Sequence, residues 1–137
     1  MLGELDYTVT VLTINEDGSL TAGNIYNTLP SDWTEFNSSA AIRLSADNKF
    51  LYVSNRGHNS ITVFAVSEDG QTLTEIQNIS TEGDFPRDFN FNADETFIIV
   101  GHQFQPQISL FKRDVETGLL TYTDNIAVNE IVCVTPA

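Results

Sequence analysis

Short runs of β-branched and apolar residues, separated by polar turns, make up most of the chain. Residues 8–14, 61–66 and 108–111 are such runs, and each leads into an acidic turn that contains glycine. The three turns are Glu16-Asp17-Gly18, Glu68-Asp69-Gly70 and Glu116-Thr117-Gly118. This order predicts a strand, a turn and a second strand.

Two further runs, residues 50–53 and 97–100, are apolar without alternation. Such a run is typical of a strand covered on both faces, although four residues alone do not exclude a helix. The flanking turn signals, residues 46–48 and 93–95, favour a strand. No segment combines a helical period with capping residues, so we expect an all-β protein.

An internal repeat is the strongest pattern in the sequence. Eight residues recur 47 positions later: Ala46, Asp47, Phe50, Val53, Ile61, Phe64, Leu73 and Thr74 as Ala93, Asp94, Phe97, Val100, Ile108, Phe111, Leu120 and Thr121. An earlier half-copy lies 52 positions upstream, where residues 10–11 and 16–18 match residues 62–63 and 68–70. A repeat of about 40–50 residues with four strands per unit is typical of a β-propeller blade.

The repeat divides the chain into a single, partial β-propeller. We expect a partial blade at about 1–36, full blades at about 37–85 and 86–127, and a closing strand at about 131–134. This amounts to eleven strands, or about 2.75 blades, whereas closed propellers have about 4–8. The chain therefore cannot close a ring by itself. We expect it to self-associate or to lack N-terminal blades, because open blades expose apolar faces and strand edges.

Charge and composition exclude several classes of function. The formal net charge of −13 disfavours binding to nucleic acid or to anionic lipid, but not to a small anion held by a few arginines. No apolar run approaches the roughly 20 residues of a membrane span, and the N-terminus does not resemble a secretory signal. The single cysteine, Cys133, is expected to be a buried small apolar residue and excludes an internal disulfide. These features predict a cytoplasmic location.

Residues 39–61 resemble the lactonase-type seven-bladed propellers, and the similarity continues through residues 80–89 to the tail at 132–134. That family contains bacterial 6-phosphogluconolactonases and fungal carboxy-cis,cis-muconate lactonizing enzymes. The resemblance implies that the chain corresponds to the C-terminal portion of a ring, because seven units of 47 residues need roughly 330 residues. It also implies hydrolysis of 6-phosphogluconolactone in the pentose phosphate route. The sequence has no P-loop, no dinucleotide glycine motif and no paired-histidine metal motif, so we expect no metal or organic cofactor.

The resemblance also implies functional residues. Arg56 and Arg87 match arginines of the family, and Glu4 resembles a glutamate in its asparagine–glutamate–leucine segment. Guanidinium groups bind phosphate or carboxylate bidentately, so both arginines are candidates for an anion site at one mouth of the channel. Where many members have alanine, glutamate, isoleucine and histidine, this chain has Ala40-Ala41-Ile42-Arg43. Arg43 can bind an anion but cannot act as a base near neutral pH.

The candidate residues fall into two groups. We predict a catalytic role for Arg56, Arg87 and His58, and a substrate-binding role for Arg43, Asn55, His102 and Gln103. His102 and Gln103 stand 47 positions after Asn55 and Arg56, so all four are expected at the same mouth. Each also has a structural interpretation, such as a solvated arginine at a strand end or a histidine in a surface turn.

Three functions remain open on the sequence. The first is hydrolysis of a phosphorylated sugar lactone by the complete or assembled protein. The second is a non-catalytic propeller segment that binds an anionic metabolite or a partner protein. The third is the muconate-lactonizing branch of the family, whose carboxylate substrate also needs arginines.

Overall fold

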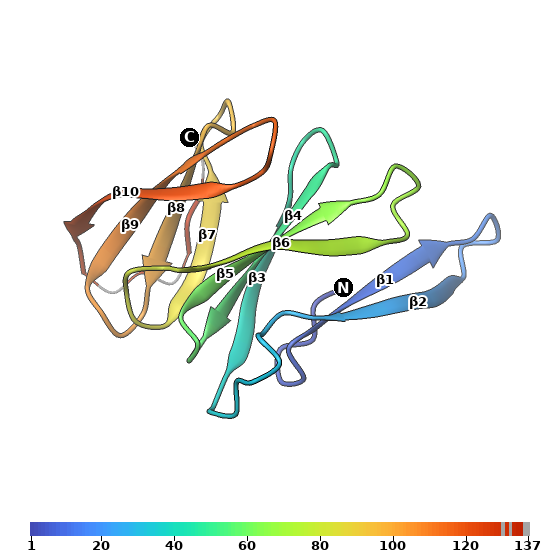
Figure 1. Ribbon diagram of the computed structural model, residues 1–137, viewed down its shortest axis with the longest axis horizontal. Coiled ribbons are helices and arrows are strands. Elements are labelled where there is room, and N and C mark those ends of the chain that lie inside the picture. The colour runs from blue at the N-terminus through green and yellow to red at the C-terminus, as the bar shows by residue number, and fades with distance from the viewer. Residues whose placement is uncertain (130, 132, 136–137) are drawn as a thin grey trace.

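A computed structural model describes residues 1–129, 131 and 133–135, and it consists of ten antiparallel strands in three sheets (Figure 1). The first sheet contains two strands, β1 (Thr8–Ile14) and β2 (Leu20–Asn27). The second contains β3 (Ser38–Leu44), β4 (Phe50–Arg56), β5 (Ser60–Val66) and β6 (Leu73–Ser80). The third contains β7 (Pro86–Phe91), β8 (Phe97–His102), β9 (Gln107–Arg113) and β10 (Leu120–Ala127).

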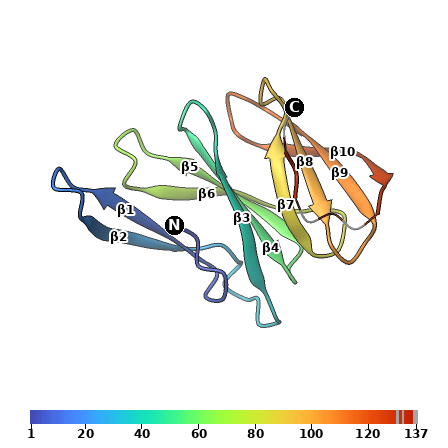
Figure 2. The ribbon, with the colours of Figure 1, turned by 180° about the vertical axis from the view of Figure 1, so that it is seen from behind.

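Each four-stranded sheet is a simple meander in which strands follow one another in chain order. The sheets stand next to one another like the vanes of a fan, and both views show β7 of the third sheet beside the second sheet (Figures 1 and 2). The contacts between these two sheets join β7 to β3 and to β4. This arrangement confirms the predicted all-β propeller fragment.

The hydrophobic core lies between successive sheets, so the second sheet is covered on both faces. Every residue of β4 from Phe50 to Arg56 is buried, as the non-alternating run predicted. One face of this sheet, including Tyr52, Ile61 and Val63, packs against the third sheet. The opposite face packs against the first sheet.

A buried polar contact joins the second and third sheets. The Tyr52 hydroxyl donates to the carbonyl of Gly118 at 2.7 Å and accepts from Nε of Arg113, also at 2.7 Å. Arg113 is 3% exposed, pairs with Glu95 and lies 5.6–5.7 Å from the ring centres of three aromatic residues. Burial is the main cause that raises the pKa of Tyr52, so the hydroxyl stays protonated and can act as both donor and acceptor.

The outer face of the third sheet has apolar residues at the same positions of the 47-residue repeat as the face of the second sheet that packs against its neighbour. An apolar depression on it is lined by Ile99, Ile108, Leu110 and Ile126, among others. Their counterparts 47 positions earlier are Tyr52, Ile61, Val63 and Ile79, which belong to the core between the second and third sheets or pack against it. The outer face of the third sheet thus carries an apolar surface at the repeat positions with which the second sheet contacts its neighbour.

The structure of the C-terminal tail differs from the sequence-based prediction in two respects. Of the expected closing strand at 131–134, Val132 lies outside the described residues, and Ile131, Cys133 and Val134 are not in strand conformation. Side chains of β7 hold the tail instead of a ladder: Val134 N donates to Asp88 Oδ2 at 2.9 Å, and Asn90 Nδ2 donates to Val134 O at 3.0 Å. A closing strand needs the remaining strands of its blade, and none of the ten strands offers that pairing. Cys133 is exposed rather than buried for the same reason.

No helix in the described part of the chain is long and apolar enough to cross a membrane.

We predict that Tyr52→Phe lowers the free energy of unfolding by about 1–3 kcal/mol, because Arg113 Nε and Gly118 O would each lose a buried partner. Tyr122→Phe is the matched control, since Tyr122 is 37% exposed and water can replace its contact. Urea unfolding followed by fluorescence measures both. Equal effects of the two substitutions would contradict a structural role of the Tyr52 hydroxyl.

Candidate functional site

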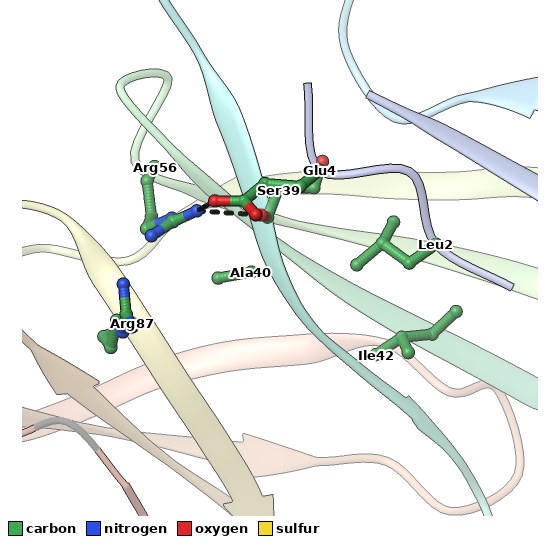
Figure 3. Close-up of a pocket in the computed structure, with 7 residues that line it drawn as sticks. All are labelled: Leu2, Glu4, Ser39, Ala40, Ile42, Arg56 and Arg87. Carbon is green, nitrogen blue, oxygen red and sulfur yellow. Dashed lines mark hydrogen bonds and ion pairs between the residues drawn. The ribbon is translucent and has the colours of Figure 1, made fainter. Parts of the chain in front are cut away.

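A pocket of about 450 Å³ opens where the N-terminal segment, the second sheet and the third sheet meet (Figure 3). Its lining residues are Leu2, Glu4, Ser39, Ala40, Ile42, Arg56 and Arg87. Arg56 and Arg87 lie on one side of this space, and Leu2 and Ile42 lie on the other (Figure 3). Two cations, one carboxylate and an apolar wall therefore surround a space large enough for a small organic anion.

Arg56 is the last residue of β4 and is only 5% exposed. Its Nε donates to Ser38 O at 3.3 Å, its Nη2 donates to Ser39 O at 3.1 Å, and the same nitrogen forms an ion pair with Glu4 Oε1. The guanidinium carbon lies 5.3 Å from the ring centre of Phe85, within cation–π range. These contacts fix the guanidinium at the edge of the pocket.

Asn55 lies beside Arg56 but is fully buried. Its Oδ1 accepts from Thr28 Oγ1 at 2.8 Å and from Ser39 Oγ at 3.0 Å, while its Nδ2 donates to Thr28 O at 3.0 Å and to Thr62 Oγ1 at 3.1 Å. The amide is thus saturated by protein groups. The structure places Asn55 inside the junction of the first two sheets, where it holds Ser39 at the beginning of β3.

Arg87 is exposed and stands near the beginning of β7. Among the described residues, neither Asp84 nor Asp88 forms an ion pair with it. A guanidinium that lines a pocket and forms no ion pair with a described carboxylate keeps donors available for a ligand.

Arg43 is not among the pocket-lining residues, so the structure does not bring the three candidate arginines into one pocket. Its Nη2 pairs with Asp88 Oδ1 at 2.9 Å, across the gap between β3 and β7. Ala41 is 6% exposed and belongs to the core between the second and third sheets, whereas Ala40 and Ile42 line the pocket. The two departures from the family pattern therefore lie at the junction of the sheets.

His58 lies in the β4–β5 turn and is also outside the pocket lining. Its Nδ1 lies 2.7 Å from Ser60 Oγ, and its ring meets Trp33 edge-on at 4.6 Å. Partial burial lowers the pKa of this imidazole, which favours the neutral form. The turn packs against the segment that precedes β3, since Asn37 Oδ1 accepts from His58 N at 3.1 Å.

His102 and Gln103 contact the connection that precedes Arg87. His102 is fully buried, with Nδ1 3.2 Å from Gln107 O, and its ring touches Gly83 so closely that an added Cβ would lie 2.6 Å from it. Gln103 N donates to Phe85 O at 3.0 Å. His102 thus contacts Gly83 and Gln103 contacts Phe85, both in the β6–β7 connection. Neither His102 nor Gln103 lines the pocket.

Glu4 is the charged pocket residue to which the sequence analysis assigned no role in the site. It precedes the first strand, and nothing in its local pattern distinguishes it from the other acidic residues of the chain. Its similarity to the family's glutamate was the one available signal. The geometry adds the decisive contact, because Ser39 N donates to Glu4 O at 2.8 Å and holds the segment against β3.

Comparison with known proteins identifies the family. The family model described as "Lactonase, 7-bladed beta-propeller" matches residues 1–136. The chain belongs to this lactonase family. Among curated relatives of the family, "Uncharacterized protein YwcC" of Lactococcus lactis is 48% identical over 138 residues. That alignment covers 99% of this chain and 40% of the relative, so the chain spans well under half the length of the protein it matches.

Solved structures of lactonase-like propellers agree with this assignment. A protein from Lactobacillus plantarum has a TM-score of 0.93 and 46% identity, covering 96% of this chain and 39% of the other. The periplasmic gluconolactonase PpgL of Pseudomonas aeruginosa has a TM-score of 0.88 and 30% identity, covering 93% and 36%. A "putative 6-phosphogluconolactonase" from Bacteroides uniformis has a TM-score of 0.84 and 32% identity, covering 95% and 37%.

The burial of His102 gives a pH-dependent prediction for this lactonase-family chain. Burial lowers the pKa of His102 from 6.5, so below about pH 6.5 the unfolded chain binds a proton that the folded chain resists. Stability is therefore complete above about pH 6.5 and falls as the pH drops toward the lowered pKa. We predict that His102→Gln makes this fall shallower below about pH 6.5, measured by urea unfolding at a series of pH values.

His58→Gln is the matched control. Burial also lowers the pKa of His58, but His58 is less buried than His102, so we expect a smaller change of slope. An unchanged slope in His102→Gln would show that other groups govern the acid sensitivity.

Proposed function

We propose that the protein containing this chain hydrolyses a sugar lactone that carries an anionic group, and that 6-phosphogluconolactone is the substrate. The observation that carries this proposal is the pocket in which Glu4, Arg56 and Arg87 meet. Membership of the lactonase family supports the type of reaction. The presence of two arginines in the pocket supports an anionic substrate, because phosphate is bound well by guanidinium forks.

The three side chains suit different parts of ester hydrolysis. Arg87, exposed and without a carboxylate partner among the residues that the structure describes, would bind the phosphate. Arg56, fixed by two carbonyls and by Glu4, would donate to the lactone oxygen as negative charge develops on it. Glu4, whose side chain is 62% exposed, would accept a proton from the attacking water.

The proposed reaction balances with water alone. Water oxygen bonds to the carbonyl carbon, its proton passes to Glu4, and the carbonyl oxygen becomes an oxyanion beside Arg56. The bond from carbon to the ring oxygen then breaks, and the proton returns from Glu4 to that oxygen. The product is the open-chain acid, which loses a further proton to solvent.

Relatives support two substrate classes, and the pocket favours one. PpgL is named a gluconolactonase and the Bacteroides protein a "putative 6-phosphogluconolactonase". The phosphorylated lactone fits better, since Arg87 would otherwise have no anion to bind. A cytoplasmic location and a place in the pentose phosphate route follow from that choice of substrate and are part of the proposal.

We also propose that activity needs further blades against the open faces. The outer face of the third sheet carries Ile99, Ile108, Leu110 and Ile126, and a second apolar depression lies between β1 and the second sheet. Additional blades of a longer protein, or a second copy of this chain, would cover them. Light scattering on the isolated 137-residue chain distinguishes these cases, because self-association would give a mass above 15.2 kDa.

In the longer protein that contains this chain, we predict that Glu4→Gln lowers kcat for freshly prepared 6-phosphogluconolactone by about 100-fold or more, because a positioned base contributes about 10²–10⁴ to such a step. The measurement is the rate of acid release above the spontaneous rate, followed with a pH indicator. Glu16→Gln is the matched control, since Glu16 is exposed in the β1–β2 turn. A Glu4→Gln rate equal to that of the control would exclude Glu4 as the base.

We predict that Arg87→Ala raises KM for 6-phosphogluconolactone at least tenfold and leaves KM for gluconolactone nearly unchanged, because one charge-assisted contact to phosphate is worth about 1.5–3 kcal/mol. Lys112→Ala, an exposed cation on β9, is the control. Equal losses on both lactones would contradict phosphate binding by Arg87 and would favour an unphosphorylated substrate.

A further inference from the structure

Phe85 has an unusual backbone for its residue type. Its φ is +63°, in the left-handed region that bulky side chains rarely adopt. Proline follows it, and a residue before proline is normally pushed to an extended conformation. Such a conformation persists only where surrounding contacts hold it, and it is concentrated at functional sites.

Three contacts hold Phe85 in place. Its N–H donates to Asn59 Oδ1 at 3.0 Å, and its carbonyl accepts from Gln103 N at 3.0 Å. Its ring packs on Phe104 with the centroids 4.3 Å apart. The residue is therefore fixed from both the second and the third sheets.

The position of Phe85 affects both arginines of the pocket. The ring of Phe85 lies 5.3 Å from the guanidinium carbon of Arg56, on the neighbouring sheet. Two residues further along the chain, Arg87 lines the same pocket. A single residue thus contacts one arginine and sets the direction in which the backbone enters β7 with the other.

We propose that Phe85 is a positioning residue for the arginine pair, and that its left-handed backbone aims the ring at Arg56 and directs Arg87 into the pocket. This rests on the proposed function in one respect, namely that the pocket binds an anion. Phe85 itself does not line the pocket, so it acts through the two arginines. An extended backbone at this position would turn the ring and the start of β7 away from their present places.

Glycine substitution separates the backbone from the ring. Phe85→Gly removes the ring and relieves the backbone, so the chain stays folded. Glu82→Gly is the matched control, because Glu82 has φ +57° in the same connection, is exposed and does not line the pocket. Phe85→Tyr keeps the ring and is the conservative variant.

The first readout is the Nε–H signal of Arg56 in an NMR spectrum of the protein without ligand. The ring of Phe85 shifts this signal, so Phe85→Gly should move it toward the position of a free arginine, whereas Phe85→Tyr and Glu82→Gly should leave it in place. The second readout is the affinity for inorganic phosphate by titration calorimetry. We expect Phe85→Gly to weaken it about two- to fivefold, the lower end of what a cation–π contact contributes, and the other two variants to keep it.

An unchanged Arg56 signal in Phe85→Gly would overturn the proposal, as would equal losses of phosphate affinity in Phe85→Gly and Glu82→Gly. A wild-type chain that binds no phosphate would instead count against the proposed function. The Arg56 signal would still decide the positioning role, because it is measured without ligand.

Discussion

Burial of one sheet face against the next is the constraint on which the rest of this structure depends. A four-stranded sheet that is apolar on both faces cannot exist alone in water, and the second sheet is covered on each side by a neighbour. Within that seam Nε of the buried Arg113 donates to the Tyr52 hydroxyl, so a charged group of the third sheet is bonded directly to the second. The outer face of the third sheet is apolar at the same positions of the repeat, and no sheet in the described part of the chain covers it.

The candidate site is a by-product of that stacking. Glu4 comes from the N-terminal segment, Arg56 from the end of β4 and Arg87 from the start of β7, so each of three separate segments contributes one charged group. The polar groups around them are chiefly structural: Asn55 ties β3 and β4 to Thr28, and Gln103 ties the connection before β7. A pocket assembled in this way keeps its geometry only while the blades stay packed.

Charge is distributed in a way that fits a small anion. The chain carries a net −13, yet three of its six basic residues, Arg43, Arg56 and Arg113, form ion pairs with carboxylates. Arg87 lies in the pocket without such a partner among the described residues. The general field repels large polyanions, whereas a local guanidinium fork can still hold one phosphate at short range.

The sequence alone determined the strands, the 47-residue unit and the propeller class, because alternation, turn residues and repetition are local properties that survive in one dimension. It also selected Arg56 and Arg87 through their resemblance to a family. Only the tertiary structure decided that Glu4 meets them, that Arg43 turns to Asp88, and that Asn55 and His102 are buried. The same holds for the tail, which side chains of β7 bind in place of a strand ladder. Those outcomes depend on which side chains distant segments bring within a few ångströms, and no local pattern records that distance.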